Sequence, residues 1–376
     1  MLGGIIILIV RVGVTLSKKK KKISLLSTLV GLLIICGLFY IAYDKGIIKF
    51  ESNKKVEEKE TDNKQDDPII EEPKEEEKSK YQIIDTTSDA RPYAVMIDNV
   101  DGARPQSGLQ SAYMVYEITV EGGLTRLLAL FKDADLSMVG PVRSARHYFL
   151  DYVWENDAIF VHHGWSPQAQ SDIETFEIQN LNGLANPSNM FWREKTKVSP
   201  HNSFTNTEKM EKAATAKKYR MTSTKYQVLS YSTTPIDLTN YASVKDASDV
   251  TIKYSNSAKI SYKYDSENKV YLRSHNGNKH IDYLTGEQLK VKNIIILNDI
   301  KVTAVAGDAK GRVNLSNVGT GSGYYITEGK AIKITWSKAS RDAKTIYRDE
   351  NNQILEVNDG NTFVQLQPSG QTPVIS

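Results

Sequence analysis

Two arginines three positions apart, Arg143 and Arg146, lie in the stretch GPVRSARHYF at residues 140–149. A Gly-Pro turn precedes them and aromatic residues follow at helical spacing, so the pattern predicts a helix over 142–156 whose first turn carries both guanidinium groups. Side chains at i and i+3 of a helix share a face, and guanidinium groups bind oxyanions through paired N–H groups. The spacing predicts a pocket for phosphate or carboxylate, although pairing with the chain's own acids would explain it equally well.

Further polar residues follow predicted strands near this stretch. In α/β folds, strands that end in glycine-rich turns before a helix are where ligands bind. The predicted ligand-binding set is Arg104, Arg126, Arg143, Ser144 and Arg146.

Three acidic residues in the same region, Asp98, Glu117 and Glu121, are candidate catalytic groups. They would also hold a divalent cation such as Mg²⁺ or Ca²⁺ if they converge. Glu117 and Glu121 are four positions apart, so the alternation of a strand predicts that both face the same side. Nothing in the spacing shows that they meet Asp98.

Histidines supply the remaining catalytic candidates, His162 and His201. His162 and His163 end a predicted strand and point to opposite faces, so at most one of them faces a cleft. Residues 164–166, Gly-Trp-Ser, are half of a nucleophile elbow, because position 168 is Gln rather than Gly. His201 is either a general base or a loop histidine bonded to backbone. The sequence has no HExxH, P-loop, GxGxxG or zinc-ligand spacing.

Short runs of β-formers between turns predict the elements that position these residues. Strands are expected at 93–99, 113–120, 126–131 and 158–164, and a helix at 205–221 capped by Thr205 or Thr207. From residue 222 the runs VTIKYS, AKISYKYD, VYLRS, VKNIIIL, AIKITW, TIYRD and TFVQLQ predict short strands. The predicted fold class is therefore α+β, with a mixed α/β domain at 81–221 and a smaller, mainly β domain at 222–376.

The N-terminal region predicts a single-pass membrane anchor. Residues 23–43 carry no charge and are long enough to span a bilayer, and five lysines precede them at 18–22. Residues 1–22 are therefore expected to be cytoplasmic and the domains extracytoplasmic, with the true translation start near Val14 or Leu16. The single cysteine, Cys36, follows the bulky Ile35, which favours an uncleaved anchor over a lipoprotein signal.

Residues 44–80 are predicted to be a flexible charged linker. Within them, residues 51–80 hold seven lysines and twelve acidic residues but little apolar content, so they cannot bury enough surface to fold. The whole chain has a formal net charge of +3. Because the basic excess lies in the N-terminus, the remainder is nearly neutral and no nucleic-acid partner is expected.

The residues RPYAVMIDN, ARPQSGLQSAYMVYEITVEGGLTRLLALF and VGPVRSAR, with the histidine-rich strand, resemble the YerB-type family of bacterial membrane-attached proteins and lipoproteins. The resemblance covers residues 81–376 and implies an anchor or signal, a polar spacer, a motif-bearing domain and a smaller C-terminal domain. The family domain has no known function. This chain departs from the family at Ile35, because lipid attachment needs a small residue just before the cysteine. It also departs at Tyr113, where an acid is expected.

A looser analogy in arrangement is to the LytR-CpsA-Psr envelope transferases, whose arginines and acids hold a polyprenyl pyrophosphate and a metal. Three hypotheses follow for this cell-membrane protein. In the first, it binds an anionic cell-envelope or cell-wall ligand in an arginine-rich cleft. In the second, it is an envelope enzyme acting on phosphorylated or glycan substrates. In the third, it is a non-catalytic scaffold whose charges pair internally.

Overall fold

The computed structural model describes residues 83, 85–184, 189–225 and 227–376. The predicted anchor, the whole predicted linker, Cys36 and the proposed translation starts lie outside these residues. Within the described residues, no helix combines the length and the apolar character that crossing a bilayer would need.

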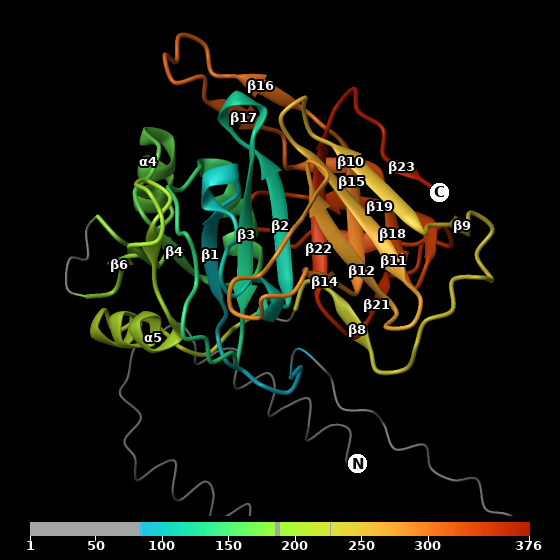
Figure 1. Ribbon diagram of the computed structural model, residues 1–376, viewed down its shortest axis with the longest axis horizontal. Coiled ribbons are helices and arrows are strands. Elements are labelled where there is room, and N and C mark those ends of the chain that lie inside the picture. The colour runs from blue at the N-terminus through green and yellow to red at the C-terminus, as the bar shows by residue number, and fades with distance from the viewer. Residues whose placement is uncertain (1–82, 84, 185–188, 226) are drawn as a thin grey trace, which may run out of the picture. The chain divides into compact units, whose positions relative to one another are not determined.

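One eleven-stranded mixed sheet runs through both halves of the described chain (Figure 1). Its path is β20-β19-β18-β15-β22-β2-β3-β1-β4-β5, with β9 paired to β19. The first half of the chain contributes β1 Tyr93–Asp98, β2 Met114–Thr119, β3 Thr125–Phe131, β4 Ile159–His162 and β5 Asn180–Asn182. The second half contributes β9 Lys245–Asp246, β15 Asn293–Ile300, β18 Gly319–Thr327, β19 Lys330–Lys338, β20 Ile346–Arg348 and β22 Thr362–Pro368.

The two halves meet where β2 and β22 pair in parallel. Met114 aligns with Thr362 and Glu117 with Gln365, so the hydrogen-bond ladder is continuous across the predicted boundary between residues 221 and 222. The residues that the structure describes belong to one compact unit by their internal contacts. The fold is a mixed α/β region with a large mixed sheet, followed by a mainly antiparallel β region.

A six-stranded second sheet covers one face of the large sheet. Its strands are β10 Asp249–Lys253, β11 Lys259–Asp265, β12 Val270–His275, β13 Asn278–Lys279, β14 Lys290–Val291 and β23 Val374–Ile375. Val95 and Ile97 of β1 pack with Val250 and Tyr262 of this sheet in one apolar cluster. In Figure 1, β10, β11 and β12 lie in front of β15, β18 and β22.

Helices cover the opposite face over the first half of the sheet. Ala94 and Met96 of β1 pack there with Tyr148, Phe149 and Tyr152 from α3 and the turn before it. Because both faces of β1–β4 are covered, these strands are continuous apolar runs, and all four predicted strands are confirmed. The helices of this face are α3 Leu150–Glu155 and α4 Pro167–Thr175. A third helix, α5 Thr207–Ala216, buries Met210 and Ala214 in the cluster on the other face, with Val95 and Ile97.

The predicted helix over 142–156 is wrong in its first half. A 3₁₀ turn begins at His147 and α3 begins only at Leu150, while Arg146 is extended with φ −126° and ψ 143°. The N–H groups of Val142 and Arg143 bond instead to the carbonyls of Ser203 and Met96, on neighbouring segments. These inter-segment bonds replace a first helical turn, so the two arginines do not share a helix face.

The second predicted helix is confirmed as α5, but its cap is Asn206 rather than Thr205 or Thr207. The Asn206 side chain accepts a hydrogen bond from the Lys209 N–H at 2.9 Å. Thr207 Oγ1 donates to the Ala134 carbonyl, and Thr205 Oγ1 donates to the Met190 carbonyl. The two threonines are held by neighbouring segments, which leaves the cap to Asn206.

The seven predicted C-terminal strands are confirmed as β10, β11, β12, β15, β19, β20 and β22. Three two-stranded ribbons complete the described fold: β6 Trp192–Arg193 with β7 Ser203–Phe204, β8 Ser230–Ser232 with β21 Glu356–Asn358, and β16 Val302–Ala304 with β17 Val313–Leu315. The β16–β17 hairpin extends over the end of β2 and β3, at the top of Figure 1.

Candidate functional site

A cavity of about 290 Å³ lies where β1 ends and β3 begins. Two carboxylates line it, Asp98 and Glu121. Its cationic side chains are Arg126, Arg143, Arg146, Lys310 and Arg312. We call it the arginine cavity. Three of the five predicted ligand-binding residues therefore line one space, together with two of the three predicted acids.

Strand register places the first pair of charged residues. Asp98 and Arg126 are direct cross-strand partners on β1 and β3, so their side chains lie on the same face of the sheet. Even-numbered residues of β1, Ala94 and Met96, belong to the cluster on the helix side. The arginine cavity therefore opens on the helix-covered face of the large sheet.

Asp98 is almost fully buried and is shared by two cationic or polar partners. His201 Nδ1 lies 2.6 Å from Asp98 Oδ2, and Arg143 Nε lies 2.9 Å from the same oxygen. The contact with Arg143 is an ion pair without hydrogen-bond alignment of its N–H. Two predicted residues far apart in sequence, His201 and Arg143, are thus brought together on a third, Asp98.

The Nη1 and Nη2 atoms of Arg143 have no hydrogen-bond partner among the residues that the structure describes. Its side chain is 23% exposed, and it lines the arginine cavity. Only Nε of this guanidinium is buried without a hydrogen-bond partner, so the two Nη groups remain accessible and can donate to an oxyanion.

Glu121 partly neutralises two other arginines of the cavity, Arg146 and Arg126. Its Oε1 accepts a hydrogen bond from Arg146 Nε at 2.5 Å, and its Oε2 lies 4.0 Å from Arg126 Nη2. Burial alone would raise the pKa of Glu121, but the hydrogen bond and the charge of Arg146 bring it below its usual value. Glu121 is therefore ionised and is an anchor for Arg146.

Arg126 is the most deeply buried cation of the cavity. Its Nη1 donates to the Ser144 carbonyl at 2.5 Å. Burial, followed by repulsion from Arg146 and Arg143, lowers the pKa of Arg126 to about 10. The guanidinium stays charged at neutral pH. The positive charges of Arg143 and Arg146 repel it, and a bound anion would reduce this repulsion.

The β16–β17 hairpin brings two cations that the sequence analysis missed. Lys310 is exposed, and Arg312 pairs with Asp308 of the same hairpin at 2.6 Å. Both side chains line the arginine cavity more than 160 positions after Arg146. No local pattern in the sequence links this hairpin to the motif at 140–149.

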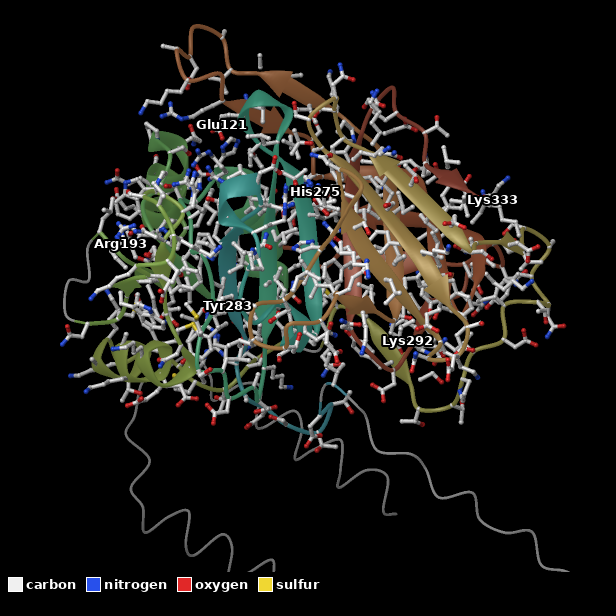
Figure 2. The ribbon with its side chains drawn as sticks, in the orientation of Figure 1. Glu121, Arg193, His275, Tyr283, Lys292 and Lys333 are labelled. Carbon is white, nitrogen blue, oxygen red and sulfur yellow. The ribbon has the colours of Figure 1, made fainter. Side chains whose placement is uncertain are left out.

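A second cavity of about 250 Å³ shares Arg143 with the first. We call it the tryptophan cavity, because Trp165 forms part of its wall with Leu184, Pro200, His163 and Arg193. Ser144 also lines it, and the Ser144 hydroxyl donates to the His163 carbonyl at 3.0 Å. Glu121 and Arg193, one from each cavity, both lie over the first half of the chain in Figure 2.

Arg104 and Glu117 are among the predicted residues that line neither cavity. Arg104 donates to the Asn99 carbonyl at 2.6 Å and pairs with Asp101. Glu117 is fully buried and forms a 2.7 Å ion pair with Arg273 of the second sheet. Its other oxygen accepts from Asn99 and Thr125.

Glu117 and Glu121 do not share a strand face, contrary to the prediction. Glu117 is within β2 and points toward the second sheet, where Arg273 lies. Glu121 follows the end of β2, in a 3₁₀ turn of residues Glu121–Gly123, where strand alternation no longer applies. Glu117 therefore points away from the cavity that Asp98 and Glu121 line, and the described residues contain no cluster of three or more His, Cys, Asp or Glu arranged to hold a metal ion.

The histidines separate as strand alternation predicts. His162 is buried, bonded to the Gly164 carbonyl and to Asn180, and burial lowers its pKa to about 4. His163 is half-buried and lines the tryptophan cavity. Ser166 is the N-cap of α4 and accepts from the Ala169 N–H, so its hydroxyl has a structural partner.

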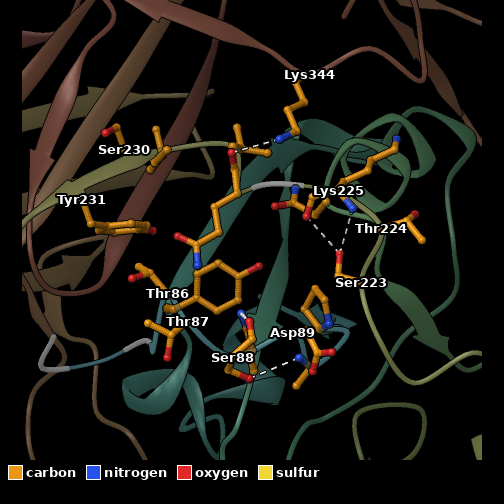
Figure 3. A pocket seen from close by; sticks show the side chains of 18 of the residues that line it. Thr86, Thr87, Ser88, Asp89, Ser223, Thr224, Lys225, Ser230, Tyr231 and Lys344 are labelled. Atoms are coloured by element: carbon orange, nitrogen blue, oxygen red, sulfur yellow. Dashed lines mark hydrogen bonds between the residues drawn. The ribbon is translucent and has the colours of Figure 1, made fainter. Parts of the chain in front are cut away.

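A larger cavity, of about 870 Å³, lies elsewhere and was not predicted. Figure 3 shows Thr86, Thr87, Ser88, Ser223 and Thr224 around it. Three lysines also line this cavity. Each donates to backbone carbonyls: Lys132 to Ser88, Lys225 to Trp154 and Lys344 to Gln227. These contacts join segments of the chain.

Comparisons with known proteins give the family. The N-terminal domain model of a protein of unknown function, DUF3048, matches residues 81–220, and the corresponding C-terminal domain model matches residues 250–364. "Putative lipoprotein YerB" of Bacillus subtilis (strain 168) is 34% identical over 279 residues, which are 73% of this chain and 77% of that protein. The crystal structure of YerB protein from Bacillus subtilis matches with a TM-score of 0.66 and 31% identity, over 76% of this chain and 94% of the other. The chain belongs to the DUF3048 family, the YerB-type family whose domains have no known function.

Proposed function

We propose that this protein is a membrane-attached, extracytoplasmic protein of the cell envelope that binds an anionic ligand, bearing phosphate or carboxylate, in the arginine cavity. Attachment to the membrane is supported by the uncharged segment 23–43 and by the name of the Bacillus subtilis relative, which describes a lipoprotein. Binding of an anion is supported by the composition of the cavity.

The observation that carries the proposal is the charge balance around Arg143. Five cationic side chains face two carboxylates in about 290 Å³, and each carboxylate already contacts an arginine. The Nη donors of Arg143 have no partner in the described part of the chain. A phosphate or carboxylate would accept from these donors and reduce the repulsion among Arg126, Arg143 and Arg146.

The test is calorimetric titration of the full chain in detergent with inorganic phosphate and with acetate. The variant Arg143→Gln keeps most of the side-chain volume but removes the charge, and Asp98 keeps His201 as a partner. We expect roughly tenfold weaker binding of the anion, because a charge-assisted hydrogen bond contributes about 1.5–3 kcal/mol.

A matched control removes two positive charges that do not line the cavity. Lys253 and Lys259 are exposed and adjacent on the β10–β11 hairpin. The double variant Lys253→Ala/Lys259→Ala should bind phosphate like the wild type, whereas Arg143→Ala/Arg146→Ala should bind neither anion. Circular dichroism and thermal melts should show that both double variants remain folded. Equal affinities in the two double variants would refute a specific site.

A second candidate function, an envelope enzyme acting on phosphorylated or glycan substrates, is favoured by the contact between Asp98 and His201. If His201 Nδ1 donates to Asp98 at 2.6 Å, Nε2 holds the lone pair that a general base needs. The experiment is hydrolysis of p-nitrophenyl phosphate by the wild type and by His201→Gln. Turnover that disappears in the variant would support the enzyme, and absence of turnover in the wild type leaves the binding proposal as the simpler one.

A further inference from the structure

The side chain of Arg143 lies between two cavities of similar size but different character. The arginine cavity is walled mainly by charged groups, and the tryptophan cavity contains Trp165, Leu184, Pro200 and Val142. Arg143 lines both, and its Nη atoms have no partner in the described ranges. One anionic group held by Arg143 would therefore have an apolar, aromatic surface directly beside it.

The tryptophan cavity is shaped by glycines. A Cβ at Gly183 would come within 2.5 Å of His163 Nδ1, so only glycine allows the imidazole to lie where it does. Gly164 has a φ of +83°, and a Cβ there would come within 3.1 Å of Ser144 Oγ and 3.3 Å of Leu184 Cδ1. The absence of a Cβ at these two glycines thus lets His163, Ser144 and Leu184 line one space.

The polar groups at the floor of this cavity are already paired. Arg193 Nη2 lies 3.3 Å from His163 Nε2, and His163 Nδ1 lies 2.7 Å from Ser203 Oγ. Because a guanidinium only donates, His163 Nε2 accepts and His163 Nδ1 donates to Ser203. His163 is therefore a wall of the cavity, and the groups left for a ligand are the Trp165 ring, the Leu184 side chain and the Arg143 fork.

Leu184 adds an accessible apolar side chain to this cavity. Its side chain is 67% exposed at the rim, although it is a large apolar residue. An indole face beside an exposed leucine fits the C–H face of a saturated ring, and the arginine next to it fits an anionic substituent of that ring. Neither the apolar group nor the arginine alone specifies such a ligand. Together, where Arg143 lines both cavities, they do.

We propose that the tryptophan cavity is a ring-binding subsite and that the ligand is an anionic sugar, with its ring on Trp165 and its phosphate or carboxylate on Arg143. The inference rests on the proposed function, because it assumes that the arginine cavity binds the anion. It adds the class of molecule that carries the anion.

The experiment compares four probes by calorimetry on the full chain in detergent: glucose 1-phosphate, inorganic phosphate, glucuronate and acetate. We expect at least one sugar to bind roughly tenfold tighter than its anion alone, which is the scale of one aromatic stacking contact. Comparing the two sugars tells whether phosphate or carboxylate is preferred.

Variants separate the two cavities. Trp165→Ala should remove the tenfold advantage of the sugar and leave the affinity for the anion alone unchanged, and Trp165→Phe should restore part of it. Leu184→Ala should weaken sugar binding a few-fold without loss of folding, because Leu184 is exposed. The matched control is Leu284→Ala, a leucine 40% exposed that lines neither cavity.

The outcomes distinguish this inference from the proposed function. If the wild type binds both anions and both sugars equally well, the ring subsite is refuted and the anion site stands. If Trp165→Ala and Leu184→Ala keep the full preference for a sugar, the ring lies elsewhere and the inference is overturned. If the wild type binds none of the four probes, the anion site itself fails, and with it the inference that rests on it.

Discussion

At the scale of single residues, two kinds of arginine are distinguished by what their donors contact. Arg273 is fully buried and bonds to Glu117, to the Tyr262 hydroxyl and to His280, so its guanidinium is used internally. Arg143 makes one ion pair and keeps both Nη groups available within the described residues. The first kind serves stability, and the second kind is the one that we expect to serve binding.

The buried pair predicts a large cost for a single change. Arg273→Met should destabilise the fold by about 3–5 kcal/mol, because it leaves the Glu117 carboxylate buried without its cation. The double variant Arg273→Met/Glu117→Gln removes both charges and should recover a large part of that loss. Urea unfolding followed by circular dichroism measures both values. A loss below about 1 kcal/mol in the single variant would contradict the pairing.

At the scale of elements, the cap of α5 is a local stabilising contact. Asn206→Ala should cost about 1 kcal/mol of unfolding free energy, because the Lys209 N–H loses its acceptor. Asn206→Asp keeps an acceptor at the same place and should be close to the wild type. Thermal melts of the two variants compare them directly, and equal melting temperatures would argue against the cap.

The β16–β17 hairpin gives a second prediction at this scale. Lys310 is exposed and lines the arginine cavity from a strand ribbon distant in sequence. Lys310→Ala should weaken phosphate binding about two- to threefold at low salt, and the difference should vanish at high salt, because exposed charges are screened. Calorimetry at two salt concentrations is the measurement. A salt-independent loss would mean that Lys310 acts by another route than its charge.

At the scale of the whole molecule, buried neutral histidines make stability depend on pH. Burial lowers the pKa of His162 to about 4, and burial with the nearby Arg104 and Arg273 lowers that of His275 to about 3. Burial, followed by Arg273, holds the pKa of His280 well below its usual value. In the unfolded chain these groups take up protons near pH 6.5, whereas the folded chain excludes them.

Stability should therefore fall as the pH drops through about 6.5 and continue to fall toward pH 4, with roughly 1 kcal/mol lost per histidine between pH 7.5 and 5.5. The lowered folded pKa means that the unfolded state binds more protons, which fixes this sign. Urea unfolding at the two pH values measures the change, and His275→Gln should reduce it. A stability that rises on acidification would contradict the burial of these histidines.

Attachment to the membrane is the other property of the whole molecule. The uncharged segment 23–43 predicts an uncleaved anchor, and the relative's lipoprotein name raises Cys36 as an alternative point of attachment. We predict that Cys36→Ser leaves the protein in the washed membrane fraction of a bacterial host. Release of the variant into the soluble fraction would show instead that lipid on Cys36 holds the protein.

Much of the fold could be predicted from the sequence, because its signals are local. The strands at 93–98, 114–119 and 159–162 are runs of buried β-formers, and such a run is readable without its neighbours. The start of α3 could not be read locally. Whether Arg143 begins a helix depends on the carbonyls of Met96 and Gly164, which bond the segment 142–146 in an extended form.

The candidate site, like the fold, could be predicted from the sequence only in part. The arginines and acids near the ends of β1 and β2 identified the region, because those residue types can bind anions wherever the chain places them. Which of them meet was decided by the tertiary structure: the pleat directs Glu117 to the second sheet, a long-range contact brings His201 to Asp98, and the β16–β17 hairpin places Lys310 at the arginine cavity. The sequence by itself thus determined the family, the strands and the chemistry available. Packing between distant segments decided which charges are paired and which remain for a ligand, since pairing depends on distances that spacing along the chain does not define.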